Sequence, residues 1–153
     1  MGMIIRKKYL GELIGMIGTP DIKVITGVRR CGKSVLLRQF ADWLEYNETN
    51  VNLISVNLQE LENAELLDYR KLHAYVCERY QEGCHNVVMI DEIQLCEQFE
   101  LAVNSLHAKQ KFDLSLTVKL EDDMVRFGST VTNNEPHTII RELQYPLVAD
   151  LNL

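Results

Sequence analysis

Residues 27–34, with the sequence GVRRCGKS, have the types and spacing of a phosphate-binding loop. They fit the pattern G-x-x-x-x-G-K-[ST], in which two glycines permit a tight turn and successive backbone N–H groups point at nucleotide phosphates. Lys33 is placed to reach the β- and γ-phosphates as a point charge, and the Ser34 hydroxyl to bind Mg²⁺. The alternative is a glycine-rich strand-to-helix turn with a chance lysine. The nucleotide-binding residues expected from this segment are Gly27, Arg29, Arg30, Cys31, Gly32, Lys33, Ser34 and Val35.

A pair of carboxylates, Asp91 and Glu92, follows the apolar run 87–90. Such a run is typical of a buried parallel strand, whose carboxyl end lies at the ligand edge of the sheet. Asp91 would hold Mg²⁺ directly or through water, and Glu92 is placed to activate the attacking water. An acidic pair is weak evidence alone, because any strand can end in charged loop residues. Downstream of an intact phosphate loop, the pattern predicts catalytic residues Glu92 and Lys33 and metal ligands Ser34 and Asp91.

These side chains need a strand before the loop and a helix after it. Residues 22–26 form a short β-branched run typical of a strand, and residues 34–44 carry apolar side chains at helical spacing without Gly or Pro. The same patterns predict an amphipathic helix over 4–17, a strand over 51–58, a long helix over about 60–81 ended by Gly83, a helix over 97–109 and a strand over 112–120, in addition to the strand of the apolar run 87–90.

The alternation of strands and helices implies right-handed crossovers and a mostly parallel sheet. The expected fold class is α/β, a P-loop NTPase-like three-layer α-β-α arrangement that is incomplete at its C-terminal end. Beyond residue 120 the patterns weaken, and 124–131 and 138–143 are candidates for short strands. The run 128–130 is more simply a turn than a phosphate site. We expect a nucleotide-binding domain over 1–120 and a tail of undetermined structure over 121–153.

Composition and charge limit the classes of function. The 153 residues fit one domain of ordinary size, and the net charge of −6 argues against wholesale nucleic-acid binding. The basic residues of the loop are accounted for by a small anionic ligand. No segment approaches the apolar length that crosses a bilayer, and charges interrupt residues 1–17, so we expect neither a membrane anchor nor a signal peptide. Four cysteines without a C-x-x-C pair argue against zinc and favour the reduced thiols of a cytoplasmic protein.

The loop at 27–34 and the DEIQ segment at 91–94 together resemble those of prokaryotic AAA-like P-loop ATPases, whose loop reads G-x-R-R-x-G-K-[ST]. The resemblance runs from about residue 6 through 23–26 to 102–106, roughly three-quarters of the chain. It implies ATP as the nucleotide, Mg²⁺-dependent hydrolysis, and the roles given above for the loop and the acidic pair. It also implies that the strand at 113–119 lies in the centre of the sheet. Relatives of this kind often self-associate, so a homo-oligomer or an unidentified protein partner is compatible with the resemblance.

The resemblance stops at about Thr117. The family usually continues into Thr-Gly-Ser-Asn, whose polar tip senses the γ-phosphate, whereas Val118, Lys119 and Leu120 follow here. Our hypothesis is a shortened or frame-altered member with an unrelated tail, and it is wrong if no other frame of the surrounding DNA encodes the missing segment. The sequence also shows no evident arginine finger, and a missing finger costs ~10³-fold or more in rate. We therefore expect nucleotide binding to survive better than turnover. Two alternatives stay open: a nucleotide-dependent interaction module, and a poorly folding fragment with an open sheet edge.

Overall fold

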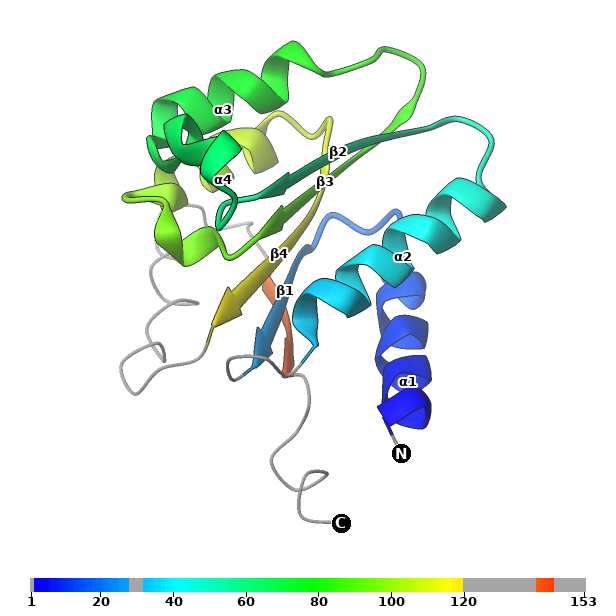
Figure 1. The fold of residues 1–153 in the computed structure, drawn as a ribbon. Coiled ribbons are helices and arrows are strands. Elements are labelled where there is room, and N and C mark those ends of the chain that lie inside the picture. Colours follow the sequence, from blue (N-terminus) through cyan, green and yellow to red (C-terminus); the bar gives the residue numbers. More distant parts are fainter. Residues whose placement is uncertain (1, 28–31, 120–139, 145–153) are drawn as a thin grey trace.

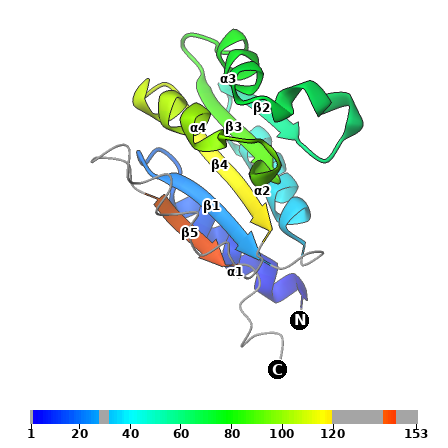
Figure 2. The ribbon, with the colours of Figure 1, turned by 90° about the vertical axis from the view of Figure 1, so that its left-hand side faces the viewer.

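Five strands form one parallel sheet in a computed structural model of the chain, which describes residues 2–27, 32–119 and 140–144. Their order across the sheet is β2-β3-β4-β1-β5, and every pair of neighbours is parallel. The strand predicted to be central, β4, is the middle one, and β5 lies beside β1 at one edge (Figure 2). The strands are β1 (Ile22–Gly27), β2 (Val51–Asn57), β3 (His85–Asp91), β4 (Asp113–Lys119) and β5 (Ile140–Gln144).

Helices cover both faces of the sheet, as Figures 1 and 2 show, so the predicted α/β three-layer arrangement is confirmed. The first two helices pack on one face and the others on the opposite face. Short 3₁₀ turns connect β2 to the third helix and β3 to the fourth. The elements are α1 (Gly2–Gly15), α2 (Lys33–Asn47), the 3₁₀ turn η1 (Leu61–Leu67), α3 (Tyr69–Glu78), the 3₁₀ turn η2 (Ile93–Leu95) and α4 (Phe99–Ala108).

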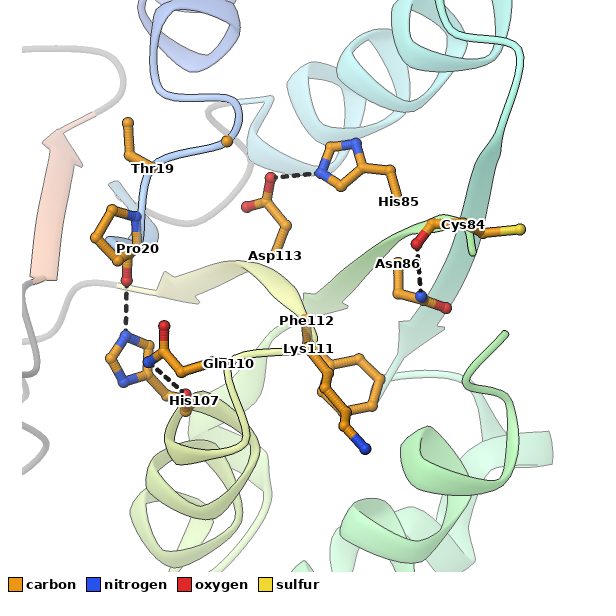
Figure 3. A pocket seen from close by; sticks show the side chains of 11 residues that line it. Thr19, Pro20, Cys84, His85, Asn86, His107, Gln110, Lys111, Phe112 and Asp113 are labelled. Atoms are coloured by element: carbon orange, nitrogen blue, oxygen red, sulfur yellow. Dashed lines mark hydrogen bonds and ion pairs between the residues drawn. The ribbon is translucent and has the colours of Figure 1, made fainter. Parts of the chain in front are cut away.

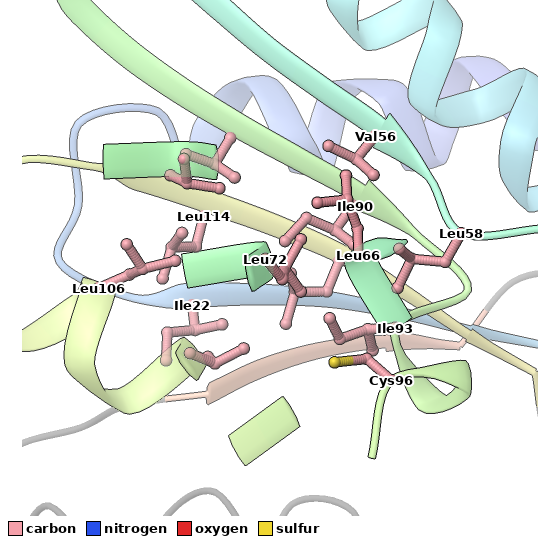
Figure 4. Packing of buried hydrophobic residues seen from close by; sticks show 14 of the residues in the cluster. Ile22, Val56, Leu58, Leu66, Leu72, Ile90, Ile93, Cys96, Leu106 and Leu114 are labelled. Carbon is pink, nitrogen blue, oxygen red and sulfur yellow. The ribbon is translucent and has the colours of Figure 1, made fainter. Parts of the chain in front are cut away.

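The alternation of side chains along β3 divides the core into two clusters. Val88 and Ile90 point towards α3 and α4, whereas Val87 and Met89 point towards α1 and α2. Successive side chains of a strand face opposite sides of a sheet, so a run that is apolar throughout needs cover on both sides. Figure 4 shows the larger cluster, where Leu72 of α3 lies among side chains of the sheet. This double cover fixes the strand whose end carries Asp91.

The long helix predicted over 60–81 is wrong, because the chain breaks at Asp68. The Asp68 backbone is extended, and its carboxylate accepts hydrogen bonds from the N–H groups of Arg70 and Lys71 at 2.8 and 3.4 Å. This is an N-cap, which begins a new helix instead of continuing the preceding turn. The helix α3 then ends at Glu78, and Gly83, with φ +83°, lies in the connection to β3.

Two further boundaries differ from the predictions or refine them. The strand predicted to end in the two carboxylates stops at the first of them, Asp91, since Glu92 has left-handed backbone angles that leave the sheet. The candidate strand at 138–143 corresponds to β5. The candidate strand at 124–131 and the end of the tail lie outside the described residues.

Candidate functional site

The carboxyl ends of β1, β3 and β4 lie side by side at one end of the strands, called here the carboxyl edge of the sheet, because all three strands run in the same direction. Gly27 ends β1, Asp91 ends β3 and Lys119 ends β4, and the first turn of α2 follows Gly27 by a short connection. Ligands of open parallel sheets bind at this edge, where loops and helix N-termini gather. The two motifs, distant in sequence, are therefore brought together by topology.

The start of α2 places Lys33 beside the end of β1. Gly32 has φ +97° and ψ +19°, a left-handed conformation that glycine adopts without steric cost, and it turns the chain into the helix. Lys33, the first helical residue, is 4% exposed, and its Nζ donates a hydrogen bond to the Gly27 carbonyl oxygen at 3.2 Å. The ammonium group thus contacts the end of β1, and it belongs to the first residue of α2, at a helix N-terminus where negative charge is stabilised.

The predicted loop residues are only partly described. Gly27 is buried, Gly32 and Val35 are half-buried, and Arg29, Arg30 and Cys31 lie outside the described residues.

Asp91 receives hydrogen bonds on both carboxylate oxygens from hydroxyl groups. Ser34 Oγ of α2 donates to Oδ2, and Thr117 Oγ1 of β4 donates to Oδ1. Asp91 is 5% exposed, whereas Ser34 is exposed to solvent. A carboxylate and a hydroxyl in contact are the hard oxygen donors that Mg²⁺ prefers, so the chemistry of the donor set fits that ion.

Thr117 is a site residue that the sequence patterns did not identify. It is fully buried, and its Oγ1 also accepts a hydrogen bond from the Glu92 backbone N–H at 2.8 Å. One hydroxyl therefore contacts both members of the acidic pair. A signal was available, since the hydroxyl residues Ser115 and Thr117 alternate with apolar residues in a strand that was expected to lie in the centre of the sheet.

Glu92 has an unusual backbone, with φ +62° and ψ +51°. Non-glycine residues rarely adopt this left-handed region, and those that do are concentrated at functional sites. The side chain is 7% exposed, and its Oε2 accepts a hydrogen bond from Gln94 Nε2. Gln94 Oε1 in turn accepts one from the Lys119 N–H at 3.4 Å.

A cavity of about 210 Å³ adjoins the Ser34–Asp91 contact, between α2 and the ends of β2 and β3. Its lining also includes the charged Arg38 and Glu60 and the polar Asn57. No set of three or more His, Cys, Asp or Glu side chains within residues 2–27, 32–119 and 140–144 is placed to hold a metal.

A second cavity, of about 290 Å³, lies at the amino ends of β3 and β4, and Figure 3 shows side chains that line it. Both histidines of its lining are paired: His85 Nε2 contacts Asp113 Oδ2 at 3.0 Å, and His107 Nε2 contacts the Pro20 carbonyl oxygen at 2.6 Å. Asp113 also forms an ion pair with Lys23, which is fully buried. Charge pairs hold this end of the sheet together, and neither the phosphate loop nor the DEIQ segment lies there.

His85 is held between two carboxylates at that end of the sheet. Its Nδ1 contacts Glu48 Oε2 at 2.7 Å while Nε2 contacts Asp113. Burial of the ring alone would lower the pKa of His85, but the hydrogen bonds and negative charges of Glu48 and Asp113 outweigh it and raise the pKa above its usual value.

Comparisons with known proteins agree with this geometry. The AAA domain family matches residues 19–126. An uncharacterized protein of Haemophilus influenzae is 35% identical over 117 residues, which cover 75% of this chain and 29% of that protein. The chain thus spans less than a third of the length of this relative. In the described ranges, no helix is long and apolar enough to cross a membrane.

Solved structures share the fold at low sequence identity. PCH-2 of C. elegans is 13% identical with a TM-score of 0.59, over 93% of this chain and 40% of that one. Domain III of the Thermotoga maritima replication initiation protein DnaA is 16% identical with a TM-score of 0.57, over 89% of this chain and 60% of that one. Identities this low are evidence for the fold alone.

Proposed function

The chain belongs to the AAA domain family, and from this premise we propose that it binds ATP and hydrolyses it with Mg²⁺ to ADP and phosphate. The observation that carries the proposal is the convergence of Lys33, Ser34 and Asp91, with Glu92 adjoining, at the carboxyl edge of the sheet. Phosphoryl transfer depends mainly on positioning and on neutralising negative charge, and these four side chains are suited to both tasks.

The phosphates would bind at the N-terminus of α2. The Lys33 ammonium, now 3.2 Å from the Gly27 carbonyl oxygen, would exchange that contact for the β- and γ-phosphates, and the helix N-terminus would add its partial positive charge. We assign the same role to the backbone of the loop, with Gly27, Arg29, Arg30, Cys31, Gly32 and Val35 as its further members.

Ser34 and Asp91 would hold the metal, Ser34 through its hydroxyl and Asp91 directly or through water. The contact between them joins α2 to β3, so both donors reach one position. Mg²⁺ held by these two residues would neutralise negative charge on the phosphates.

Glu92 would act as the general base. Its carboxylate accepts a proton from water as the water oxygen adds to the γ-phosphorus, and the bond from that phosphorus to the ADP oxygen breaks. The hydrogen bond that the Glu92 N–H donates to Thr117 Oγ1 fixes the peptide that carries this carboxylate. Burial at 7% exposure limits competing contacts with bulk water.

Nucleotide titration tests the binding half of the proposal. ATP and GTP are titrated with and without Mg²⁺ into wild type, Lys33→Ala and the control Lys71→Ala, whose lysine is exposed on α3. We expect Lys33→Ala to weaken ATP binding about tenfold or more, because hydrogen bonds to charged groups contribute ~1.5–3 kcal/mol. Equal affinity of wild type and Lys33→Ala would contradict the assignment.

Phosphate release tests the hydrolysis half. Glu92→Gln removes the base while keeping the size of the side chain, so turnover should fall about 10²-fold or more with ATP affinity retained. Binding without turnover in wild type would instead support the nucleotide-dependent interaction module.

A further inference from the structure

We propose that Gln94 is a positioning residue that sets the orientation of the Glu92 carboxylate. The inference rests on the proposed ATP hydrolysis and concerns the same site. Its starting point is the hydrogen bond from Gln94 Nε2 to Glu92 Oε2. Residues two apart seldom meet on a regular helix, and these two meet because Glu92 has a left-handed backbone immediately before η2.

The Glu92 main chain is fixed independently of Gln94. The Glu92 N–H donates to Thr117 Oγ1 at 2.8 Å, and Thr117 is fully buried on the central strand. This bond sets where the side chain begins but leaves its own torsions to rotate. The Gln94 amide supplies the restraint on the far end of the side chain, at one carboxylate oxygen.

The Gln94 amide is itself anchored. Its Oε1 accepts a hydrogen bond from the Lys119 N–H, the last residue of β4, at 3.4 Å. Gln94 Oε1 faces the Lys119 N–H donor, and Gln94 Nε2 faces the Glu92 carboxylate acceptor. The opposite orientation of the amide would place two acceptor oxygens against each other, so the hydrogen bonds determine the orientation. The pairing connects the end of the central strand to the proposed base through one half-buried side chain.

This arrangement leaves one carboxylate oxygen for water. Oε2 accepts from the amide, and Oε1 has no hydrogen-bond partner within the part of the chain that the structure describes. The amide is neutral, so it orients the carboxylate without taking its proton-accepting role. Loss of such orientation acts on the chemical step more than on nucleotide binding, because the phosphate-binding groups are elsewhere.

The test compares three variants of the full chain. Gln94→Met keeps the length of the side chain and removes the amide, and Gln94→Glu keeps the shape but places a second carboxylate against Glu92. Gln81→Met is the matched control, since Gln81 is exposed at the opposite end of β3. We expect kcat for ATP to fall on the order of tenfold in both position-94 variants with KM changed less than about twofold, and neither value to change in Gln81→Met.

Thermal melts without nucleotide test the contact separately. Gln94→Met should lower Tm in the wild-type background and have a smaller effect in a Glu92→Ala background, because contacting residues are non-additive. An unchanged kcat in both position-94 variants of a wild type that hydrolyses ATP would overturn the inference and leave the proposed function standing. Absence of hydrolysis in wild type would overturn the catalytic proposal and the positioning role together, and the melts would then report a structural contact only.

Discussion

The hydroxyl of Thr117 on β4 donates a hydrogen bond to the carboxylate of Asp91 on β3. The oxygen of the same hydroxyl accepts the N–H of Glu92 at 2.8 Å. One buried side chain of the central strand thus satisfies the proposed metal ligand and orients the peptide of the proposed base. The proposed catalytic site therefore combines the end of β1 and the start of α2 with the ends of β3 and β4.

Thr117→Val should destabilise the protein and impair hydrolysis. Valine has the same shape but leaves the Glu92 N–H without its partner in a buried position, which costs about 1–3 kcal/mol. The measurement is urea denaturation together with phosphate release.

Ser115→Ala on the same strand is the matched control. The Ser115 hydroxyl is buried, and among the described residues it has no partner, so its removal should leave the free energy of unfolding unchanged or slightly increased. Equal losses of stability in the two variants would show that the hydrogen bonds of Thr117 are unimportant.

Breaking the ion pair between Lys23 and Asp113 should be among the most destabilising changes in the sheet. Lys23 is fully buried, so Asp113→Leu would leave its ammonium without the carboxylate that balances it, at a cost of roughly 3–5 kcal/mol. The double variant Lys23→Met/Asp113→Leu removes both charges and should recover much of that loss. A double-mutant cycle in urea measures the difference, and additive losses would contradict a coupled pair.

The sequence predicts the features of this fold that depend on local pattern. The β-branched run before Gly27 and the apolar run before Asp91 are strands because both are buried on two faces, and the central place of β4 agrees with the family resemblance. The break at Asp68 was missed, since apolar spacing continues across it and the cap depends on one side chain turning back to the N–H groups.

Contacts between distant residues could not be predicted in the same way. Thr117 lies 26 residues from Asp91 and Lys23 lies 90 residues from Asp113, and neither pair falls within one sequence motif. Parallel register decides both, because it brings β4 between β1 and β3 with Ser115 opposite Lys23 and Met89. Local pattern predicts the strands themselves but not the register that pairs residues of neighbouring strands.

The stability contributed by His85 should depend on pH with a definite sign. The pKa of folded His85 is raised above the ordinary 6.5, since the hydrogen bonds to Glu48 and Asp113 outweigh the effect of burial. The protonated ring therefore stabilises the folded state fully below pH 6.5, and this contribution is lost as pH rises through the folded pKa. The free energy of unfolding of wild type minus that of His85→Gln should decrease as pH rises above 6.5.

The experiment on His85 needs a comparison histidine. His73 has a lowered pKa, caused by burial and then by Lys109. The free energy of unfolding of wild type minus that of His73→Gln should therefore increase with pH up to about 6.5 instead of decreasing. The same decrease in both differences would point to a general effect of pH and not to the Glu48–His85–Asp113 contacts.

Cys96 should resist alkylation in the native protein. It is 1% exposed, and burial, followed by the charges of Asp68, Glu100 and Glu97, raises the pKa of its thiol to about 11 from an ordinary 9.0. The thiolate is the reactive form, so a hundredfold smaller thiolate fraction is expected in addition to the lack of access. Iodoacetamide labelling followed by peptide mass spectrometry should modify half-buried Cys84 long before Cys96.

Because the Cys96 N–H donates a hydrogen bond to the Ile93 carbonyl oxygen at 3.0 Å and so closes η2, labelling of Cys96 reports opening of the turn that carries Gln94. Gln94→Met should therefore speed labelling of Cys96 while that of Cys84 stays constant, and equal rates at Cys96 in the two proteins would show that the Gln94 amide does not hold this turn closed.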